Sequence, residues 1–500
     1  MYPNVEEREP LADTVKKELS FKATYFYHER DGKPGSAYPW LSGIQIVEPH
    51  RETTMTVRQG GLEGMTYRWT ITPADPKGEV IKAEGDGAVI VFKSLERNTV
   101  LLEEVSNETG EVVLWIEEDV MCKYVRREIR ALLEEERQEL FDAMRLMWEL
   151  DTASGRKMYG AEYISAVDLG RFHVAAGASY ECDHLHDGLG FTTSHVLITN
   201  IFERSLQLIN PRLTMPYWDF TIDTSGKDTD MLKDCPLFQE SWFGGFDSED
   251  YQVKDGRWAN WTIPDTTLGW QQEGLTDAYG RLRSPWSTNH RGALTRRFGD
   301  TCDGDLTSYK PLPECGNHYD LLTTFSTFYG FTWESMGRSH GALHIYLGGV
   351  IDCTEQYDRV AELVGDGVAS TMRQTGSVSK KLLYRAGLLS CSADKANRPL
   401  NTFEQLFSTG VCGCHGLNLD TGDDFNQVFE AAGLDPDIID PSNNEDTRRE
   451  LARILCNTPA NSGDHAQASS NLDPSFWPTH PTMERLWVYK VCPRTALCDC

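Results

Sequence analysis

The histidines of this 500-residue chain are unevenly spaced, and their spacing is the first indication of chemistry. Four of the thirteen fall within 23 positions, at His173, His184, His186 and His195. His340 and His344 form an HxxxH pair, which places two imidazoles on one helix face, where they can share a metal ion. No glutamate follows His340, so the pair lacks the base that a zinc protease helix carries.

Each group needs a third ligand to hold a metal. The first group offers His173, His195 and one of His184 and His186, whereas the second finds a partner in His480, within NLDPSFWPTHPTMERLW. Sites made only of imidazoles suit copper, zinc, iron or nickel, and two such sites facing each other in a helix bundle predict a dinuclear centre. The remaining histidines are predicted to be surface or hydrogen-bonded groups: His28, His50, His290, His318, His415 and His465.

Two different patterns of apolar residues along the chain predict a mixed fold, and this fold must position the clustered histidines. Residues 1–35 form an N-terminal extension, and seven short apolar runs between 36 and 121 predict an antiparallel, all-β sandwich of immunoglobulin-like size. From Cys122 onward, apolar residues recur at helical spacing, beginning with KYVRREIRALLEEERQELFDAMRLMWEL. Residues 122–500 are therefore predicted to form a mainly α domain with a four-helix bundle around the metal site.

Charge and cysteine content limit the class of protein. The chain has 48 basic and 76 acidic residues, a net charge of −28, so neither nucleic acid nor an anionic membrane is expected as a partner. The opening MYPNVEEREP lacks the apolar region of a signal peptide. Thirteen cysteines nevertheless favour an oxidising compartment, either secreted or an organelle lumen, with up to six disulfides and one thiol left over.

Longer motifs surround the clustered histidines. HDGLGFTTSHVLITNIFERSLQLINPRLTMPYWDF begins at His186 and encloses Phe191, Glu203 and a PYWD stretch. SHGALHIYLGG contains the HxxxH pair, and DPSFWPTHPTMERLW contains His480. Together these motifs resemble the copper-site motifs of tyrosinases, catechol oxidases and molluscan haemocyanins, over a stretch from roughly 122 to 490.

The resemblance implies a ligand set for two copper ions, with dioxygen as co-substrate. His173, His186 and His195 would bind one ion, and His340, His344 and His480 the other. His184 stays the alternative to His186, because Cys182-Asp183-His184 has the spacing of the cysteine–histidine thioether that many family members form. An ordinary thiol or half of a disulfide is the other interpretation of Cys182.

The resemblance also implies an activity on a small phenolic substrate, the oxidation of o-diphenols (catechols) to o-quinones. Haemocyanin-like reversible binding of dioxygen is the alternative. Glu334 resembles the glutamate that positions a water as base in members proficient at monophenol hydroxylation, and a solvated helix residue is its other interpretation. Gly341 stands where those members have asparagine, which weakens the case for hydroxylation more than for catechol oxidation.

One long segment departs from the family pattern. A helical insert at about 355–465 separates His344 from His480 and contains KKLLYRAGLL and DTRRELARIL. A lid over the site and a remotely packed subdomain are both compatible with it. Outside the ligand set, Asp219, Glu203 and Arg485 are expected either to orient imidazoles or to tie bundle helices together.

Overall fold

In the computed structural model the described residues fall into two compact units, one within Met1–Val125 and the other within Arg126–Pro493. The residues described are 19–24, 26–27, 44–58, 62–225, 235–265, 275–299, 312–351, 356–392, 411–420, 424–457 and 461–491. Both helices and strands occur, as the mixed fold class predicts. None of the helices in these ranges combines the length and the apolar character that crossing a membrane requires.

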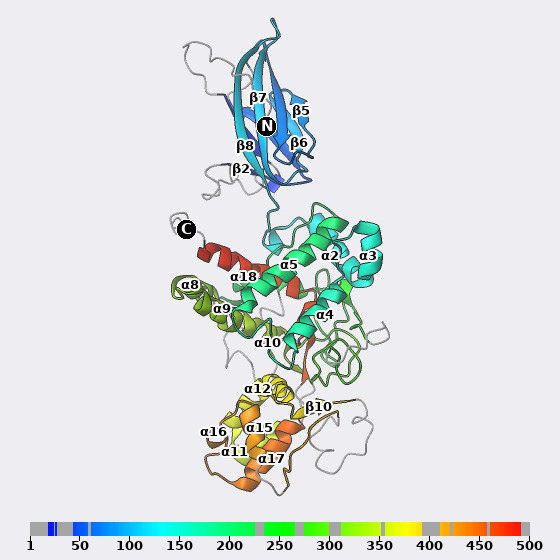
Figure 1. The fold of residues 1–500 in the computed structure, drawn as a ribbon, viewed down its shortest axis with the longest axis vertical. Helices are drawn as coiled ribbons and strands as arrows, with labels where there is room; N and C mark the ends of the chain where they lie inside the picture. The colour runs from blue at the N-terminus through cyan, green and yellow to red at the C-terminus, as the bar shows by residue number, and fades with distance from the viewer. Residues whose placement is uncertain are drawn as a thin grey trace. The chain divides into compact units, whose positions relative to one another are not determined.

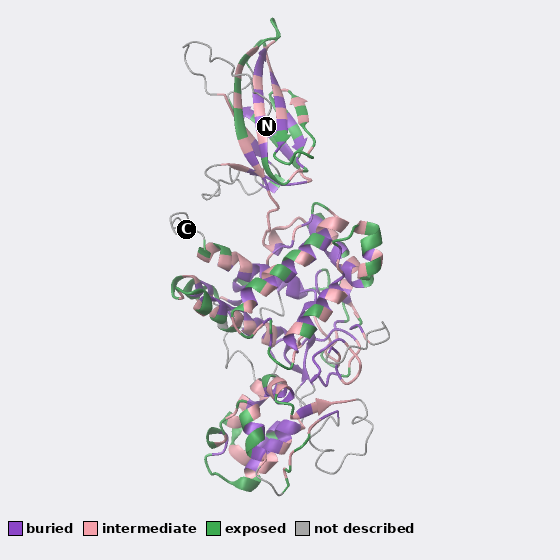
Figure 2. Ribbon diagram, viewed as in Figure 1, coloured by how far each residue is buried: buried purple, intermediate pink, exposed green. Residues whose placement is uncertain are grey.

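Two β-sheets make up the described part of the first unit (Figure 1). One has the strand order β1-β3-β6 and the other β2-β8-β7-β4-β5. Side chains alternate between exposed and buried along β3 and β6 (Figure 2), and both sheets supply residues to one buried cluster, including Met55 and Trp69. The strands are β1 (Ser20–Thr24), β2 (Gln45–Val47), β3 (Glu52–Arg58), β4 (Met65–Pro73), β5 (Ile81–Glu84), β6 (Gly87–Val91), β7 (Glu96–Ser106) and β8 (Val112–Cys122).

Two features of these sheets differ from the sequence-based expectation. β1 lies inside the stretch assigned to an N-terminal extension, where it pairs with β3. β2 pairs with β8 in parallel rather than antiparallel, because no hairpin joins them and β2 joins the sheet beside its last strand. The immunoglobulin-like sandwich and its limits at 36 and 121 stay predictions.

Helices dominate the second unit, and α5 (Gly190–Ile209) lies at its centre. Its buried residues Phe191, His195, Ile198, Phe202 and Leu206 recur every three to four positions, so one face of the helix enters the core. α5 packs against four other helices, although a four-helix bundle as such stays a prediction. These neighbours are α2 (Glu134–Glu149), α4 (Ala166–Gly177), α9 (Phe328–Met336) and α18 (Phe476–Val491).

The first helix of this unit begins later than its sequence predicts. Helical spacing starts at residue 123, yet α2 starts at Glu134. The chain before it is extended because it pairs with the PYWD stretch: the amide of Ile129 donates to the Tyr217 carbonyl, and the Tyr217 amide donates to the Arg127 carbonyl. Backbone pairing across the core therefore outweighs local helix propensity here.

The chain leaves the core to form the helical insert and returns to the core at an adjacent point. β9 (Val350–Ile351) pairs antiparallel with β12 (Asn461–Ser462), so the insert is closed off at its base. Within it, α11, α12, α15 and α17 pack on one another (Figure 1). Its elements are α11 (Gln356–Val364), α12 (Asp366–Arg385), β10 (Leu389–Cys391), β11 (Cys412–Cys414), α15 (Phe425–Ala431), α16 (Pro436–Ile439) and α17 (Glu445–Cys456).

Two disulfides staple the insert, Cys391–Cys412 and Cys414–Cys456. The described cysteines that are free are Cys122, Cys182, Cys235 and Cys315. Two disulfides are thus formed among the described cysteines, and the expectation of up to six for the whole chain stays a prediction. Cys302, Cys353, Cys492, Cys498 and Cys500 lie outside the described residues.

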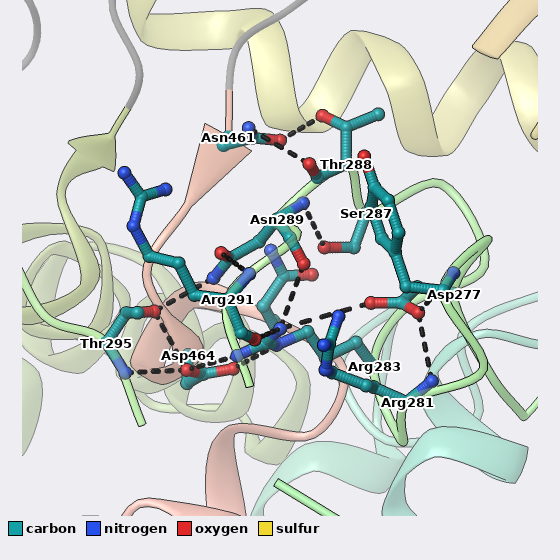
Figure 3. Close-up of polar contacts among 12 residues, drawn as sticks. Asp277, Arg281, Arg283, Ser287, Thr288, Asn289, Arg291, Thr295, Asn461 and Asp464 are labelled. Atoms are coloured by element: carbon teal, nitrogen blue, oxygen red, sulfur yellow. Dashed lines mark hydrogen bonds and ion pairs between the residues drawn. The ribbon is translucent and has the colours of Figure 1, made fainter. Parts of the chain in front are cut away.

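Two buried ion pairs fix the segment that returns from the insert. Arg283 donates to both carboxylate oxygens of Asp464, at 2.6 and 3.0 Å, and Arg296 pairs in the same bidentate way with Asp473. Figure 3 shows Asp464 also facing Thr295, whose amide and hydroxyl donate to it at 2.8 Å. Bidentate guanidinium–carboxylate pairs hold one geometry, so the chain between Asn461 and Asp473 is rigidly placed.

Candidate metal centre

Three histidines from two helices and the loop between them form a first triad. α4 supplies His173, the loop after it supplies His186, and α5 supplies His195. One ring nitrogen from each lies within 4.8 Å of the other two. This triad contains His186, the preferred ligand, and not His184, whose side chain is exposed.

The second triad comes from two helical segments distant in sequence. His340 lies in η7 (Gly337–Gly341), a π-helical turn between α9 and α10 (Ala342–Gly348), and His344 follows on α10. α18 supplies His480. The Nε2 atom of His340 lies 3.0 Å from that of His480 and 2.8 Å from that of His344, so the three nitrogens converge on one point.

The two triads face each other. The rings of His195 and His480 stack with their centroids 4.6 Å apart. Phe191 contacts both triads, because its ring centroid lies 4.6 Å from that of His195 and 5.2 Å from that of His340. The arrangement suits a dinuclear centre with an aromatic residue between its halves.

The outer nitrogen of most of these imidazoles is held by a backbone carbonyl or a carboxylate. Nδ1 is therefore protonated and donates, which leaves the Nε2 lone pair directed inward. The Nε2 atoms of His173 and His195 are buried and have no hydrogen-bond partner among the described residues, as a metal site requires. The Nδ1 contacts are His173 to the Ala468 carbonyl (2.6 Å), His186 to Asp183 (2.9 Å), His195 to the Phe191 carbonyl (2.8 Å), His344 to the His465 carbonyl (3.0 Å) and His480 to the Phe476 carbonyl (2.8 Å).

Burial favours the neutral form of several ligand imidazoles. Desolvation, together with neighbouring imidazoles, lowers the pKa of His173 and of His340 to about 3. The same causes hold the pKa values of His195, His344 and His480 well below the usual value. Protons therefore do not compete with a cation for these nitrogens near neutral pH, and an all-imidazole donor set fits copper.

An aspartate beside the first triad links it to the insert. Asp183 accepts from Nδ1 of His186 through one oxygen, and its other oxygen pairs with the Lys381 ammonium of α12 at 2.8 Å. Burial opposes ionisation of this carboxyl, yet the hydrogen bond with His186 and the charge of Lys381 hold its pKa well below the usual range. A carboxylate on Nδ1 strengthens the basicity of the opposite nitrogen.

Cys182 lies against His184 rather than against a triad member. Its Sγ is 3.4 Å from Nδ1 and 3.7 Å from Nε2 of His184, so it faces the ring carbon between those nitrogens. Cys182 is a free thiol in the structure. A thioether stays a prediction, and this geometry directs it to a histidine outside the triad.

The two residues considered for monophenol hydroxylation are placed differently. Glu334 is half-buried on α9 and is absent from the described residues that line the cavity beside the triads. Gly341 does line that cavity. A Cβ atom at 341 would lie 2.6 Å from the carbonyl oxygen of Met336, because the π turn brings that carbonyl close. The backbone therefore disfavours an asparagine at this position.

Asp219, Glu203 and Arg485 contact charged partners instead of ligand imidazoles. Arg126 pairs with Glu203 at 2.6 Å and with Glu484. Arg485 pairs with Asp219 at 3.1 Å. These pairs tie α5 and α18 to the neighbouring chain segments, which is the second of the two roles expected for them.

A cavity of about 350 Å³ opens beside the triads. His186, His340 and His344 line one part of it, and Val378, Lys380 and Lys381 of α12 line another. Arg385 anchors α12 by donating to the carbonyls of Ser179 at 3.0 Å and Gly177 at 3.2 Å. α12 of the insert thus forms a wall of the cavity, which a remotely packed subdomain would not do.

Sequence reasoning missed one histidine of this cavity. His465, expected to be a surface or hydrogen-bonded group, is fully buried and lines the cavity with its ring centroid 4.5 Å from that of His344. Burial lowers the pKa of His465 to about 4. It stands alone in the sequence, so no spacing signal could have identified it. Asp183 was detectable only as the residue inside the Cys-x-His triplet.

Removing the carboxylate behind His186 should weaken the first copper site. We expect Asp183→Asn to lower copper affinity by about 10–100-fold, measured by competition with a chelator, because His186 loses its anionic partner. Asp320, an exposed aspartate, provides a matched control, and Asp320→Asn should stay within a few-fold of the parent protein. Unchanged affinity in Asp183→Asn would show that His186 needs no such partner.

The copper-free protein should lose stability on acidification. The buried imidazoles stay neutral in the folded state, whereas in the unfolded chain they take up protons near pH 6.5. The unfolded state therefore binds more protons below that pH, so the stabilising contribution is complete above pH 6.5 and falls as the pH drops toward about 3. Thermal unfolding across this range measures it. His480→Leu removes one such group and should flatten the dependence; a slope equal to that of the parent would contradict this account.

Comparison with known proteins agrees with this geometry. Residues 164–373 match the family model for the common central domain of tyrosinase. Grixazone synthase of Streptomyces griseus subsp. griseus is 28% identical over 192 residues, which cover 33% of this chain and 57% of that protein. Tyrosinase-like protein 2 of Margaritifera margaritifera is 31% identical over 243 residues (46% and 44%), and a tyrosinase-like protein of Pinctada maxima is 30% identical over 220 residues (43% and 39%).

These matches span about half the length of the relatives. The matched segment contains five of the six triad histidines, all but His480. The resemblance found in the histidine motifs is therefore correct, and residues 164–373 match the common central domain of tyrosinase.

Proposed function

We propose that this chain is a copper-dependent oxidase that converts o-diphenols to o-quinones with dioxygen. The observation that supports this best is the pair of buried imidazole triads, with inward-facing Nε2 atoms, beside a cavity that a small molecule can enter. The tyrosinase match supports the same class of reaction. Two o-diphenols and one dioxygen give two o-quinones and two waters, so the reaction needs no further reductant.

The six triad histidines would hold the metal: His173, His186 and His195 one ion, and His340, His344 and His480 the other. Two copper ions bound there supply dioxygen binding and the exchange of two electrons. Burial in the chain favours the neutral form of His173 and His340, and Nδ1 contacts at five of the six ligands keep their lone pairs inward.

The cavity supports a phenol as substrate. Its volume of about 350 Å³ lies at the lower end of the range for small-molecule sites. Phe191, Ile345 and Val378 offer apolar surface for an aromatic ring, next to His340 and His344. A protein that only carries dioxygen needs no such space, so the cavity favours oxidation over reversible dioxygen binding.

Catechol oxidation is favoured over monophenol hydroxylation. The asparagine associated with hydroxylation is replaced by Gly341, and Glu334 is not among the described cavity residues. α12 of the insert bounds the same cavity, and we propose that it limits which phenols enter.

The reconstituted full chain should bind two copper ions, measured by metal analysis, and should consume dioxygen rapidly with a catechol and slowly or not at all with tyrosine. His195→Ala and His480→Ala should each lower the copper content and reduce dioxygen consumption to background, because each removes one ligand of a triad. His415→Ala, at an exposed histidine, is the control and should match the parent protein. Full copper content without catechol oxidation, but with reversible dioxygen binding, would favour the carrier function instead.

A further inference from the structure

His465 is a buried histidine that the proposed metal ligation does not use. It lies in η8 (Asp464–Ala466), between the base of the insert and α18. Its side chain is 0% exposed, lines the cavity together with His340 and His344, and has neither ring nitrogen hydrogen-bonded to any described residue. The six triad histidines direct a nitrogen at the expected metal positions, whereas His465 belongs to neither triad.

The surroundings of His465 hold it in this place. Its own carbonyl accepts a hydrogen bond from Nδ1 of His344 at 3.0 Å. The preceding Asp464 is fixed by Arg283 and by Thr295 (Figure 3). The ring therefore cannot shift far to find a partner within the protein, because its backbone is anchored on both sides.

A neutral imidazole offers one hydrogen-bond donor and one acceptor. Leaving such groups unpaired in the interior disfavours the folded state, so native proteins usually satisfy them with a ligand or an ordered water. His465 is among the residues that line the cavity, and Lys380, Ser287 and Asn461 are other polar residues along its wall. A polar group on whatever occupies the cavity can pair with His465.

Resting on the proposed function, we propose that His465 is a positioning residue that hydrogen-bonds the second of two adjacent oxygens on a bound o-diphenol. One oxygen of the substrate must approach the triads, which leaves the adjacent oxygen to meet a polar group on the cavity wall. A monophenol lacks that oxygen and would leave the imidazole unpaired. A site built to hydrogen-bond a substrate hydroxyl discriminates strongly against an analogue without it. His465 would thus select o-diphenols over monophenols.

Binding without turnover tests this selection separately from activity. 4-Nitrocatechol and 4-nitrophenol are titrated into the copper-loaded protein under argon, and the ratio of their dissociation constants is measured. His465→Leu should reduce the preference for the catechol by roughly tenfold, because it removes one hydrogen bond, while binding of the phenol changes little. His465→Gln keeps a donor and an acceptor and should restore much of the preference. His415→Leu, at an exposed histidine, should leave the ratio unchanged.

Copper content of each variant separates positioning from ligation. Full copper in His465→Leu together with a reduced preference supports the proposal. A preference equal to that of the parent protein overturns it, and so does loss of copper, which would make His465 a metal ligand. If His465→Leu does not fold, the ratio of dissociation constants in His465→Gln decides the question. A ratio below one tenth of the parent value would contradict the proposal, because the glutamine amide keeps a donor and an acceptor. A parent protein that binds no copper would instead refute the proposed function.

Discussion

The structure depends on turning six imidazoles, four of them buried and two half-buried, toward one another. Nitrogens of separate rings approach to 2.8 and 3.0 Å in the second triad. Such an arrangement leaves lone pairs unsatisfied in the core, and each unsatisfied polar atom opposes folding by about 1–3 kcal/mol. A bound cation relieves this cost, so folding and metal binding are expected to be coupled. The outer nitrogens must be held at the same time, which is why so many backbone carbonyls point at histidine rings.

The carbonyls that accept from the ligand histidines lie in two kinds of segment, helices and irregular chain. Phe191 and Phe476 lie four residues before His195 and His480, so α5 and α18 provide their carbonyls as part of the helix itself. Ala468 and His465 lie in the irregular segment that returns from the insert, and only tertiary contacts can place them. The buried pairs Arg283–Asp464 and Arg296–Asp473 provide those contacts. Buried ion pairs contribute little net stability, but their bidentate geometry fixes where the chain runs.

Residues whose role follows from local periodicity could be predicted from the sequence. The HxxxH pair, the spacing of His186 and His195 and the apolar stripe of α5 are all set within one helix or one motif, and the structure brings the predicted histidines together. Residues whose role depends on distant chain could not be predicted. The start of α2 is delayed by pairing with Tyr217, and Lys381 reaches Asp183 across 198 residues. His465 carries no local signal because its environment is made by segments on either side of the insert.

The pairing of the chain at the two ends of the insert explains how the core can contain so long an insertion. Because β9 and β12 are paired, the chain leaves and re-enters the core at neighbouring points, and the segment from Asn461 to Asp473 can occupy one fixed path. That path delivers the Ala468 and His465 carbonyls to the two triads. α12 of the insert contacts the core through Lys381 and Arg385, on the loop that carries His186. Changes in α12 can therefore alter the cavity wall without moving the metal ligands on the helices behind it.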